Sequence, residues 1–194
     1  MANIFQQLEI EAFRAGVTPR TKQSINWFRK RASDLGAINP SSITRQKPIK
    51  SVNTFMPGSM YMYYYDPKHK DTLPYYDTFP LVILVDKAPG GFYGLNLHYL
   101  PLTLRAKMLD GLMENTNNKK FDESTRIAVN YQMLKAASTL GYFKPCFKHY
   151  LSDHVKSKFS YVPPAEWEIA TFLPTAQFKK ASQNKVWKDS RRMV

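Results

Sequence analysis

The stretch that decides the fold is GSMYMYYY at residues 58–65, followed by LVILV at 81–85 and FYGLNLH at 92–98. The first segment is dense in Tyr and Met, which favour a pleated surface, and the second is apolar on both faces, as in a strand that is buried on both sides. Short turns separate the segments. We therefore expect an α+β fold with a small bent antiparallel sheet or barrel over about 58–100, which a strand at 158–162 would extend or close.

Helical patterns flank this centre. Apolar residues recur at helical spacing from Phe5 to Gly16, and Thr18-Pro19 is a typical start for a second helix that ends at Gly36. A basic connector over 37–57 follows. Further helices are expected after Pro101 and Pro163-Pro164, over 122–141 and around 144–153. These patterns predict a helical basic arm and connector (1–57), a mixed α/β core (58–174) and a basic C-terminal helix or tail (175–194).

The charge of the chain is strongly positive. The 194 residues include 28 Lys and Arg but only 15 Asp and Glu, which gives a formal net charge of +13. This imbalance favours polyanions such as nucleic acid, or acidic protein partners. The basic residues concentrate near the two ends, where we expect contact with phosphates or acidic neighbours from Arg20, Lys22, Arg29, Lys30, Arg31, Lys179, Lys180, Arg191 and Arg192.

Aromatic residues gather in the central segment. A strand rich in Tyr can be a core whose hydroxyls reach the surface, a protein interface, or a platform on which bases stack. The sequence leaves these three readings open. The residues that we expect to anchor a protein interface are Tyr61, Tyr63, Tyr75, Tyr76 and Trp187.

Few sites for catalysis can be recognised. Cys146 is the single cysteine, so neither a disulfide within the chain nor a multi-cysteine zinc site is expected, and no phosphate-binding glycine motif occurs. We expect no metal, no cofactor and no enzymatic activity. Asp77 and Asp86 are the residues that a metal-dependent nuclease would use, a distant alternative. The N-terminus does not resemble a signal peptide, and no apolar run is long enough for a membrane span, so no membrane partner is expected.

Several motifs carry a resemblance. They are GSMY at 58–61, DPK at 66–68, LPYYD at 73–77, FPLV at 79–82, GF at 91–92, GLN at 94–96 and HYLP at 98–101, with WEIA at 167–170, FLP at 172–174, VW at 186–187 and DSR at 189–191. In these motifs the chain resembles a small virion protein of large contractile-tailed bacteriophages of the T-even type. The resemblance implies a protein made in the host cytoplasm and carried in the virion, either a baseplate or neck subunit or a DNA end protector.

Two functions follow from the residues and the resemblance together. The first is a non-enzymatic structural component of the baseplate, neck or head–tail region, oligomeric within the assembly, which docks on other virion subunits through its aromatic and basic surfaces. The alternative is a protein that binds double-stranded DNA and protects packaged genome ends.

Overall fold

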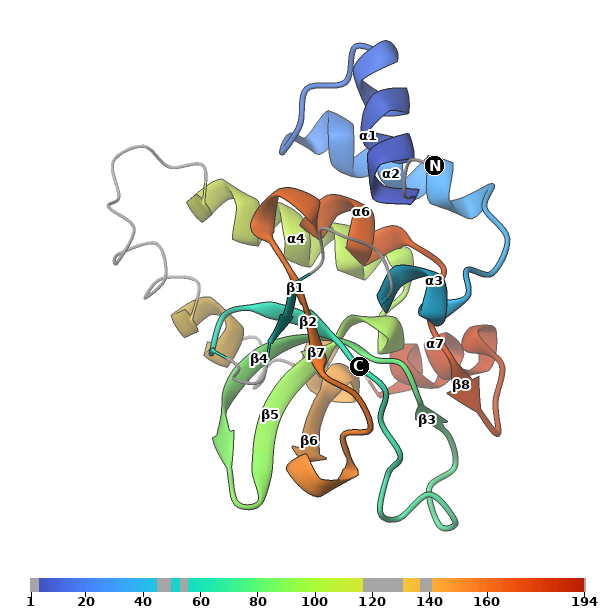
Figure 1. The fold of residues 1–194 in the computed structure, drawn as a ribbon, viewed down its shortest axis with the longest axis vertical. Coiled ribbons are helices and arrows are strands. Elements are labelled where there is room, and N and C mark those ends of the chain that lie inside the picture. Colours follow the sequence, from blue (N-terminus) through green and yellow to red (C-terminus); the bar gives the residue numbers. More distant parts are fainter. Residues whose placement is uncertain (1–3, 45–49, 53–55, 117–130, 137–140, 194) are drawn as a thin grey trace.

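The computed structural model describes residues 4–44, 50–52, 56–116, 131–136 and 141–193 (Figure 1). In this part of the chain, six antiparallel strands form one sheet in the order β1-β7-β2-β4-β5-β6. A separate two-stranded sheet joins β3 to β8. The strands are β1 (Lys50–Val52), β2 (Met60–Met62), β3 (Tyr76–Asp77), β4 (Leu81–Ala88), β5 (Gly91–Asn96), β6 (Phe147–Leu151), β7 (Phe159–Val162) and β8 (Phe178–Lys179).

The predicted α+β class and the antiparallel sheet are confirmed, and β7 joins the sheet where a strand at 158–162 was expected. The barrel alternative is wrong. The sheet stays open because β1 is added outside β7 and β6 outside β5, and these two edge strands do not pair with each other.

Alternating residues of the central strand face two different cores. Met60 and Met62 belong to a large cluster on the helical side of the sheet, whereas Tyr61, Tyr63 and Tyr65 belong to a second, aromatic cluster on the opposite side. This division follows from the twofold repeat of a strand, in which successive side chains point to opposite faces. Both faces of the sheet are therefore covered.

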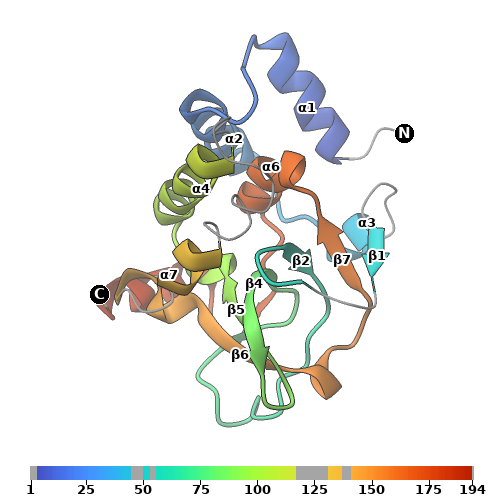
Figure 2. The same cartoon turned by 90° about the vertical axis from the view of Figure 1, so that its left-hand side faces the viewer.

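Four helices lie on one side of the sheet (Figures 1 and 2). Helices α4 (Leu102–Thr116) and α6 (Trp167–Phe172) are nearest to it, and α2 (Lys22–Ser33) and α1 (Ile4–Arg14) lie farther out, where α2 packs on α4 and α6 and α1 packs on α2 and α6. The left-handed backbone of Gly16 follows α1, as expected. The helix expected at Thr18-Pro19 begins instead at Lys22, because Thr21 and Ser24 form a reciprocal capping box.

The remaining described helices are shorter or lie outside this layer. They are α3 (Pro40–Thr44), α7 (Gln183–Arg192) and the 3₁₀ turns η1 (Leu97–Tyr99), η2 (Gly141–Cys146), η3 (Ser152–His154) and η4 (Pro164–Glu166). The connector expected over 37–57 therefore contains α3 and β1. Of the helix expected over 122–141, residues 131–136 are helical, 141 lies in η2, and 122–130 and 137–140 lie outside the described residues.

The helix expected around 144–153 is wrong. This segment holds the end of η2, then β6 and η3. Strand β6 forms because residues 147–151 pair with β5, where Gly91 allows the carbonyl oxygen of Tyr150 to approach closely.

One apolar core extends through all three predicted segments. Phe5 and Ile25 of the first segment, Leu81 and Leu109 of the second and Val186 of the third belong to the same cluster. The N-terminal helices thus bury one face against each other and against α4 and α6. The division of the chain at 57/58 and 174/175 stays a prediction.

Candidate nucleic-acid interface

The N-terminal basic residues lie on and before α2. Arg20, Lys22 and Lys30 are exposed, and Arg29 is half-buried. Arg31 is held by Glu11, with 2.7 Å between its Nε and the carboxylate Oε2. This ion pair raises the pKa of Arg31 and lowers that of Glu11.

A groove separates α2 from α4, with a volume of about 270 Å³. We call it the basic groove. Its charged lining consists of Lys22, Arg29, Lys107 and Asp110, of which Lys22 and Asp110 lie 3.6 Å apart as an exposed pair. Exposed pairs of this kind are weak. The groove also contains Asn26 and Thr103, side chains that can bind phosphate oxygens.

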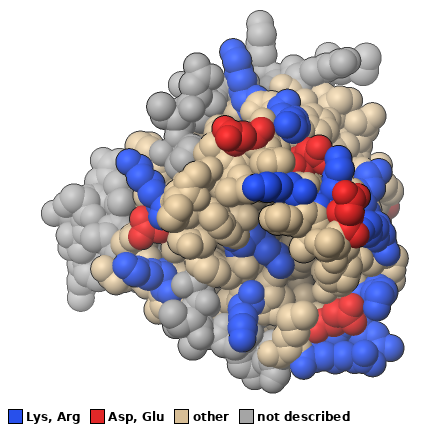
Figure 3. Space-filling view, turned by 90° about the horizontal axis from the view of Figure 1, so that it is seen from below, with Lys and Arg blue, Asp and Glu red and all other residues tan. Residues whose placement is uncertain are grey.

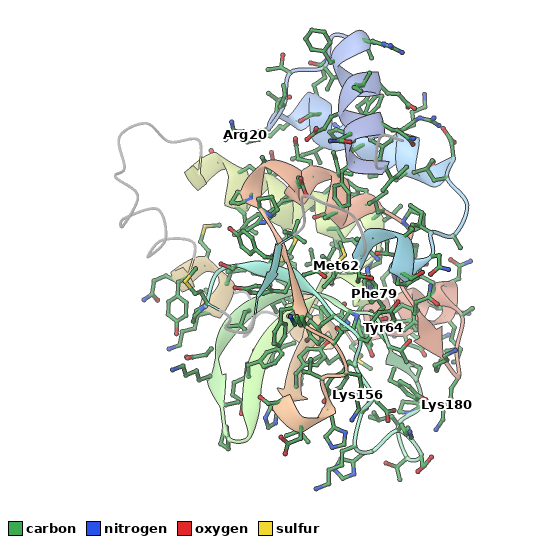
Figure 4. The ribbon with its side chains drawn as sticks, in the orientation of Figure 1. Arg20, Met62, Tyr64, Phe79, Lys156 and Lys180 are labelled. Carbon is green, nitrogen blue, oxygen red and sulfur yellow. The ribbon has the colours of Figure 1, made fainter. Side chains whose placement is uncertain are left out.

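The C-terminal basic residues Lys179, Lys180, Arg191 and Arg192 are all exposed, on β8, after it and on α7. Of these two groups, Arg20 and Lys180 lie well apart, Arg20 in the upper part of the molecule and Lys180 low on its other side (Figure 4). From below, Lys and Arg side chains are spread around much of the surface, with fewer acids between them (Figure 3).

Two of the expected interface anchors are not on the surface. Tyr61 is 2% exposed and Tyr63 is fully buried, and both pack on aromatic rings such as that of Phe159. They are core residues because they point into the aromatic cluster under the sheet. Trp187 is half-buried and attaches α7 to the core, since its Nε1 donates to the carbonyl of His98 at 2.9 Å.

Tyr75 and Tyr76 are half-buried and line a larger cavity of about 600 Å³. We call it the tyrosine pocket. Its other lining residues come from the end of the β2 segment, the 67–77 loop, η1, β6 and the C-terminus: Tyr65, Pro67, Lys68, His69, Leu73, Pro74, Asp77, Tyr99, Lys148, His149, Tyr150, Leu151 and Met193.

Lys148 is the basic residue set deepest in the tyrosine pocket. Its Nζ lies 4.0 Å from the centre of the Tyr99 ring, a cation–π contact. Burial lowers the pKa of Lys148. Among the described residues, no carboxylate lies within ion-pairing distance of this amine. Lys148 is therefore a partly desolvated amine without a carboxylate partner in the part of the chain that the structure describes.

The loop wall of the tyrosine pocket is held by side chains. The amine of Lys180 donates to three backbone carbonyls, those of Lys70, Asp71 and Leu73, at 2.6, 2.9 and 3.1 Å. On the other side of the loop, the carbonyl of Asp66 accepts from His154 Nδ1 at 2.7 Å. The predicted phosphate contact Lys180 thus has a structural role in fixing the loop.

A buried polar network lies beneath the same wall. The carboxylate of Asp77 accepts from the backbone N–H groups of Phe79 and Gln177 (3.0 and 3.1 Å), from Asn96 (3.2 Å) and from His98 Nδ1 (2.7 Å). His98 Nε2 lies 3.1 Å from the hydroxyl of Thr175. The carboxylate, imidazole and hydroxyl have the order of a hydrolytic triad, yet His98 and Thr175 are fully buried and Asp77 is only 4% exposed.

Both members of the buried pair have shifted pKa values. Burial alone raises the pKa of Asp77, but the interaction with His98 and the hydrogen bonds from Phe79 and Asn96 outweigh it, and the pKa lies below its ordinary value. Burial lowers the pKa of His98 and outweighs the opposing effect of Asp77. The network therefore holds a carboxylate and a neutral imidazole at neutral pH.

The residues of the nuclease alternative have separate partners. Asp77 belongs to the buried network, whereas Asp86 accepts from the hydroxyl of Tyr131 at 2.8 Å. In the part of the chain that the structure describes, no three His, Cys, Asp or Glu side chains are grouped so that they could hold a metal ion. The same part contains no helix that is long and apolar enough to cross a membrane.

Sequence reasoning missed most of the tyrosine pocket. Tyr75 and Tyr76 are among the residues expected to anchor a protein interface, and Lys68 and Tyr99 occur in the motifs of the resemblance, but no expectation from the sequence included Lys148 or Tyr150. The local signal was present as alternation in FKHYL at 147–151, where Lys148 and Tyr150 share one strand face.

A basic groove together with a cavity of tyrosines and lysines is typical of proteins that bind nucleic acid. Comparison with known families agrees: the model of the Phage T4 terminal DNA protecting protein family matches residues 3–190, so the chain belongs to that family. No curated protein and no solved structure matches the chain.

Proposed function

We propose that this protein binds the ends of linear phage DNA in the virion and shields them from nucleases. The family match over residues 3–190 supports this proposal most strongly. It acts by occupying the DNA end and catalyses no reaction. The expected structural alternative, a baseplate or neck subunit, ranks below it.

The net charge of +13 supplies long-range attraction to phosphates. The phosphates of the DNA backbone are contacted by three residues of the basic groove, Lys22, Arg29 and Lys107. Exposed residues outside the groove add further contacts: Lys30, Lys179, Arg191 and Arg192. Arg31 contributes less, because Glu11 already neutralises it.

The test compares binding of the purified protein to a linear duplex and to a closed circle of matched sequence, each at two salt concentrations. Phosphate contacts weaken steeply as salt rises. We expect a preference for the linear form that survives moderate salt, and protection of that form from an exonuclease. Equal binding to both forms that disappears at physiological salt would show that the charge serves acidic protein neighbours instead.

A second role, docking on other virion subunits, is favoured by the outer face of α1. Phe13 is 83% exposed and Ile10 is 46% exposed, beside an apolar cavity that contains Val17, Phe28 and Ile169. Exposed aromatic side chains next to a cavity are typical of protein interfaces. Phe13→Ser should fold as the wild type does and lose incorporation into virions. Normal incorporation would argue against docking through this face.

A further inference from the structure

We propose that the tyrosine pocket binds an unpaired terminal nucleotide of a DNA strand, with the base stacked on Tyr75 and the phosphate beside Lys148 and Lys68. This inference rests on the proposed function, since it takes DNA as the ligand. The inference adds to the proposed function a way in which the protein distinguishes a DNA end from continuous duplex, namely by binding an unpaired terminal base.

The tyrosine rings supply a neutral stacking surface. Tyr75 and Tyr76 are half-buried, so part of each residue is accessible at the cavity, and the centre of the Tyr75 ring lies 6.0 Å from that of the Tyr99 ring at an interplanar angle of 38°. Tyrosine hydroxyls are protonated at neutral pH because their ordinary pKa is about 10. Burial raises the pKa of Tyr65, Tyr75 and Tyr150 further, so these groups do not repel a phosphate. Stacking of bases on aromatic side chains is tolerant of sequence.

The charges of the pocket suit an anion. Lys148 is partly desolvated and has no carboxylate beside it among the described residues, and Lys68 lies exposed at the same cavity. The one acidic lining residue, Asp77, is 4% exposed and its carboxylate oxygens accept four hydrogen bonds from neighbouring groups. An incoming phosphate would therefore meet amines before it meets that carboxylate.

The size of the pocket explains why an end would be selected. A cavity of about 600 Å³ falls in the usual range for small-molecule sites, roughly 300–1,000 Å³, and is suited to a single nucleotide. A base inside a duplex must first be unpaired and unstacked before it can enter the pocket, which costs a few kcal/mol. A terminal base that is already unpaired does not have this cost of breaking a base pair.

The walls of the pocket are fixed before a ligand arrives. The Lys180 amine holds the loop at Lys70, Asp71 and Leu73, and the backbone N–H of Leu151 donates to the hydroxyl of Tyr65 at 3.0 Å. A site with fixed walls loses less conformational entropy on binding.

The experiment uses the full chain and three DNA probes of matched sequence: a hairpin with a blunt end, the same hairpin with one or two unpaired terminal nucleotides, and a dumbbell closed at both ends. A 2-aminopurine in the unpaired position reports stacking by loss of fluorescence. The wild type should bind the probe with the unpaired nucleotides best and quench its fluorescence.

Variants then separate the contributions of the pocket. Tyr75→Leu should weaken binding of the unpaired probe roughly 10-fold or more and abolish quenching, whereas Tyr75→Phe, which keeps the ring, should behave as the wild type. Lys148→Met keeps the apolar stem and should weaken the same probe several-fold. The matched control is Lys156→Met, which removes an exposed lysine outside the pocket. Thermal melting confirms that each variant is folded.

The outcomes distinguish the two proposals. If the wild type binds the dumbbell as tightly as the open probes, the proposed end binding fails. If it prefers open ends but folded Tyr75→Leu and Lys148→Met bind and quench like the wild type, end binding stands and the pocket assignment is overturned. Pocket variants that bind all DNA normally but are lost from virions would assign the cavity to a protein partner instead.

Discussion

Replacing Asp77 by Asn tests the buried network that supports the tyrosine pocket. The change preserves shape but removes the charge and turns one acceptor oxygen into a donor. If the amide oxygen stays toward the N–H groups of Phe79 and Gln177, its NH₂ group faces Asn96 and His98, which both donate in the wild type. Two charge-assisted hydrogen bonds are then lost.

Each such bond contributes about 1.5–3 kcal/mol, so two bonds contribute roughly 3–6 kcal/mol. His98 can recover one of them by changing tautomer, because the hydroxyl of Thr175 can then accept from Nε2. We therefore expect Asp77→Asn to lower the free energy of unfolding by about 3 kcal/mol. At this chain length, that loss corresponds to a fall in Tm of roughly 6–12 °C.

The assay is equilibrium unfolding in urea at pH 7, followed by tryptophan fluorescence. Asp71→Asn is the matched control, because Asp71 is exposed, and it should change stability by less than about 0.5 kcal/mol. A loss below about 1 kcal/mol for Asp77→Asn would refute the argument that the charged carboxylate organises the network. Loss of a metal-dependent cleavage activity without loss of stability would instead favour the nuclease alternative.

Three further predictions concern pH, backbone packing and salt. The pKa of His98 is lowered from 6.5, so below about pH 6.5 the unfolded chain binds more protons than the folded one. The free energy of unfolding therefore decreases as the pH is lowered, by at most about 1.4 kcal/mol per pH unit for this group. His98→Asn should make the urea midpoint depend less on pH between about pH 6.5 and 4.5. Gly91→Ala places a Cβ 1.8 Å from a carbonyl oxygen of β6 and should cost about 2–3 kcal/mol in urea unfolding, whereas Gly36→Ala meets nothing within 4 Å and should not. Lys107→Gln should reduce the slope of log K against log salt by about 1 if Lys107 contacts a phosphate, and Lys156→Gln should not.

The faces of the central strand were predictable because they depend only on local alternation. Tyr61 and Tyr63 were both predicted on a strand; Tyr61 lies on β2, whereas Tyr63 lies just after its end at Met62. Their burial was not predictable, since it depends on β5, β6 and β7 closing over that side with Phe92, Tyr150 and Phe159. The sequence left core, interface and stacking readings open, and only tertiary packing separates them.

The tyrosine pocket could not be predicted because it depends on strand register. Tyr75 and Lys148 are far apart in sequence, and they line one cavity only because β6 pairs with β5 in the register that sets Lys148 opposite Gly94. The prediction of a helix around 144–153 would place Lys148 and Tyr150 on different faces. Strand β6 after Pro145 has only five residues, so its alternation of side chains is too short to favour a strand over a helix in the sequence.

Net charge alone does not account for the proposed recognition of a DNA end. A charge of +13 attracts every stretch of duplex equally, because phosphates repeat along its whole length. Selection of an end needs a contact that only an end offers, and an unpaired base face is such a contact. The basic groove is formed by α2 and α4, whereas the tyrosine pocket is formed by η1, β6 and the loop that Lys180 holds. In the two proposals, attraction through the basic groove and selection of an end use different residues, namely Lys22, Arg29 and Lys107 in the groove and Tyr75 and Lys148 in the pocket.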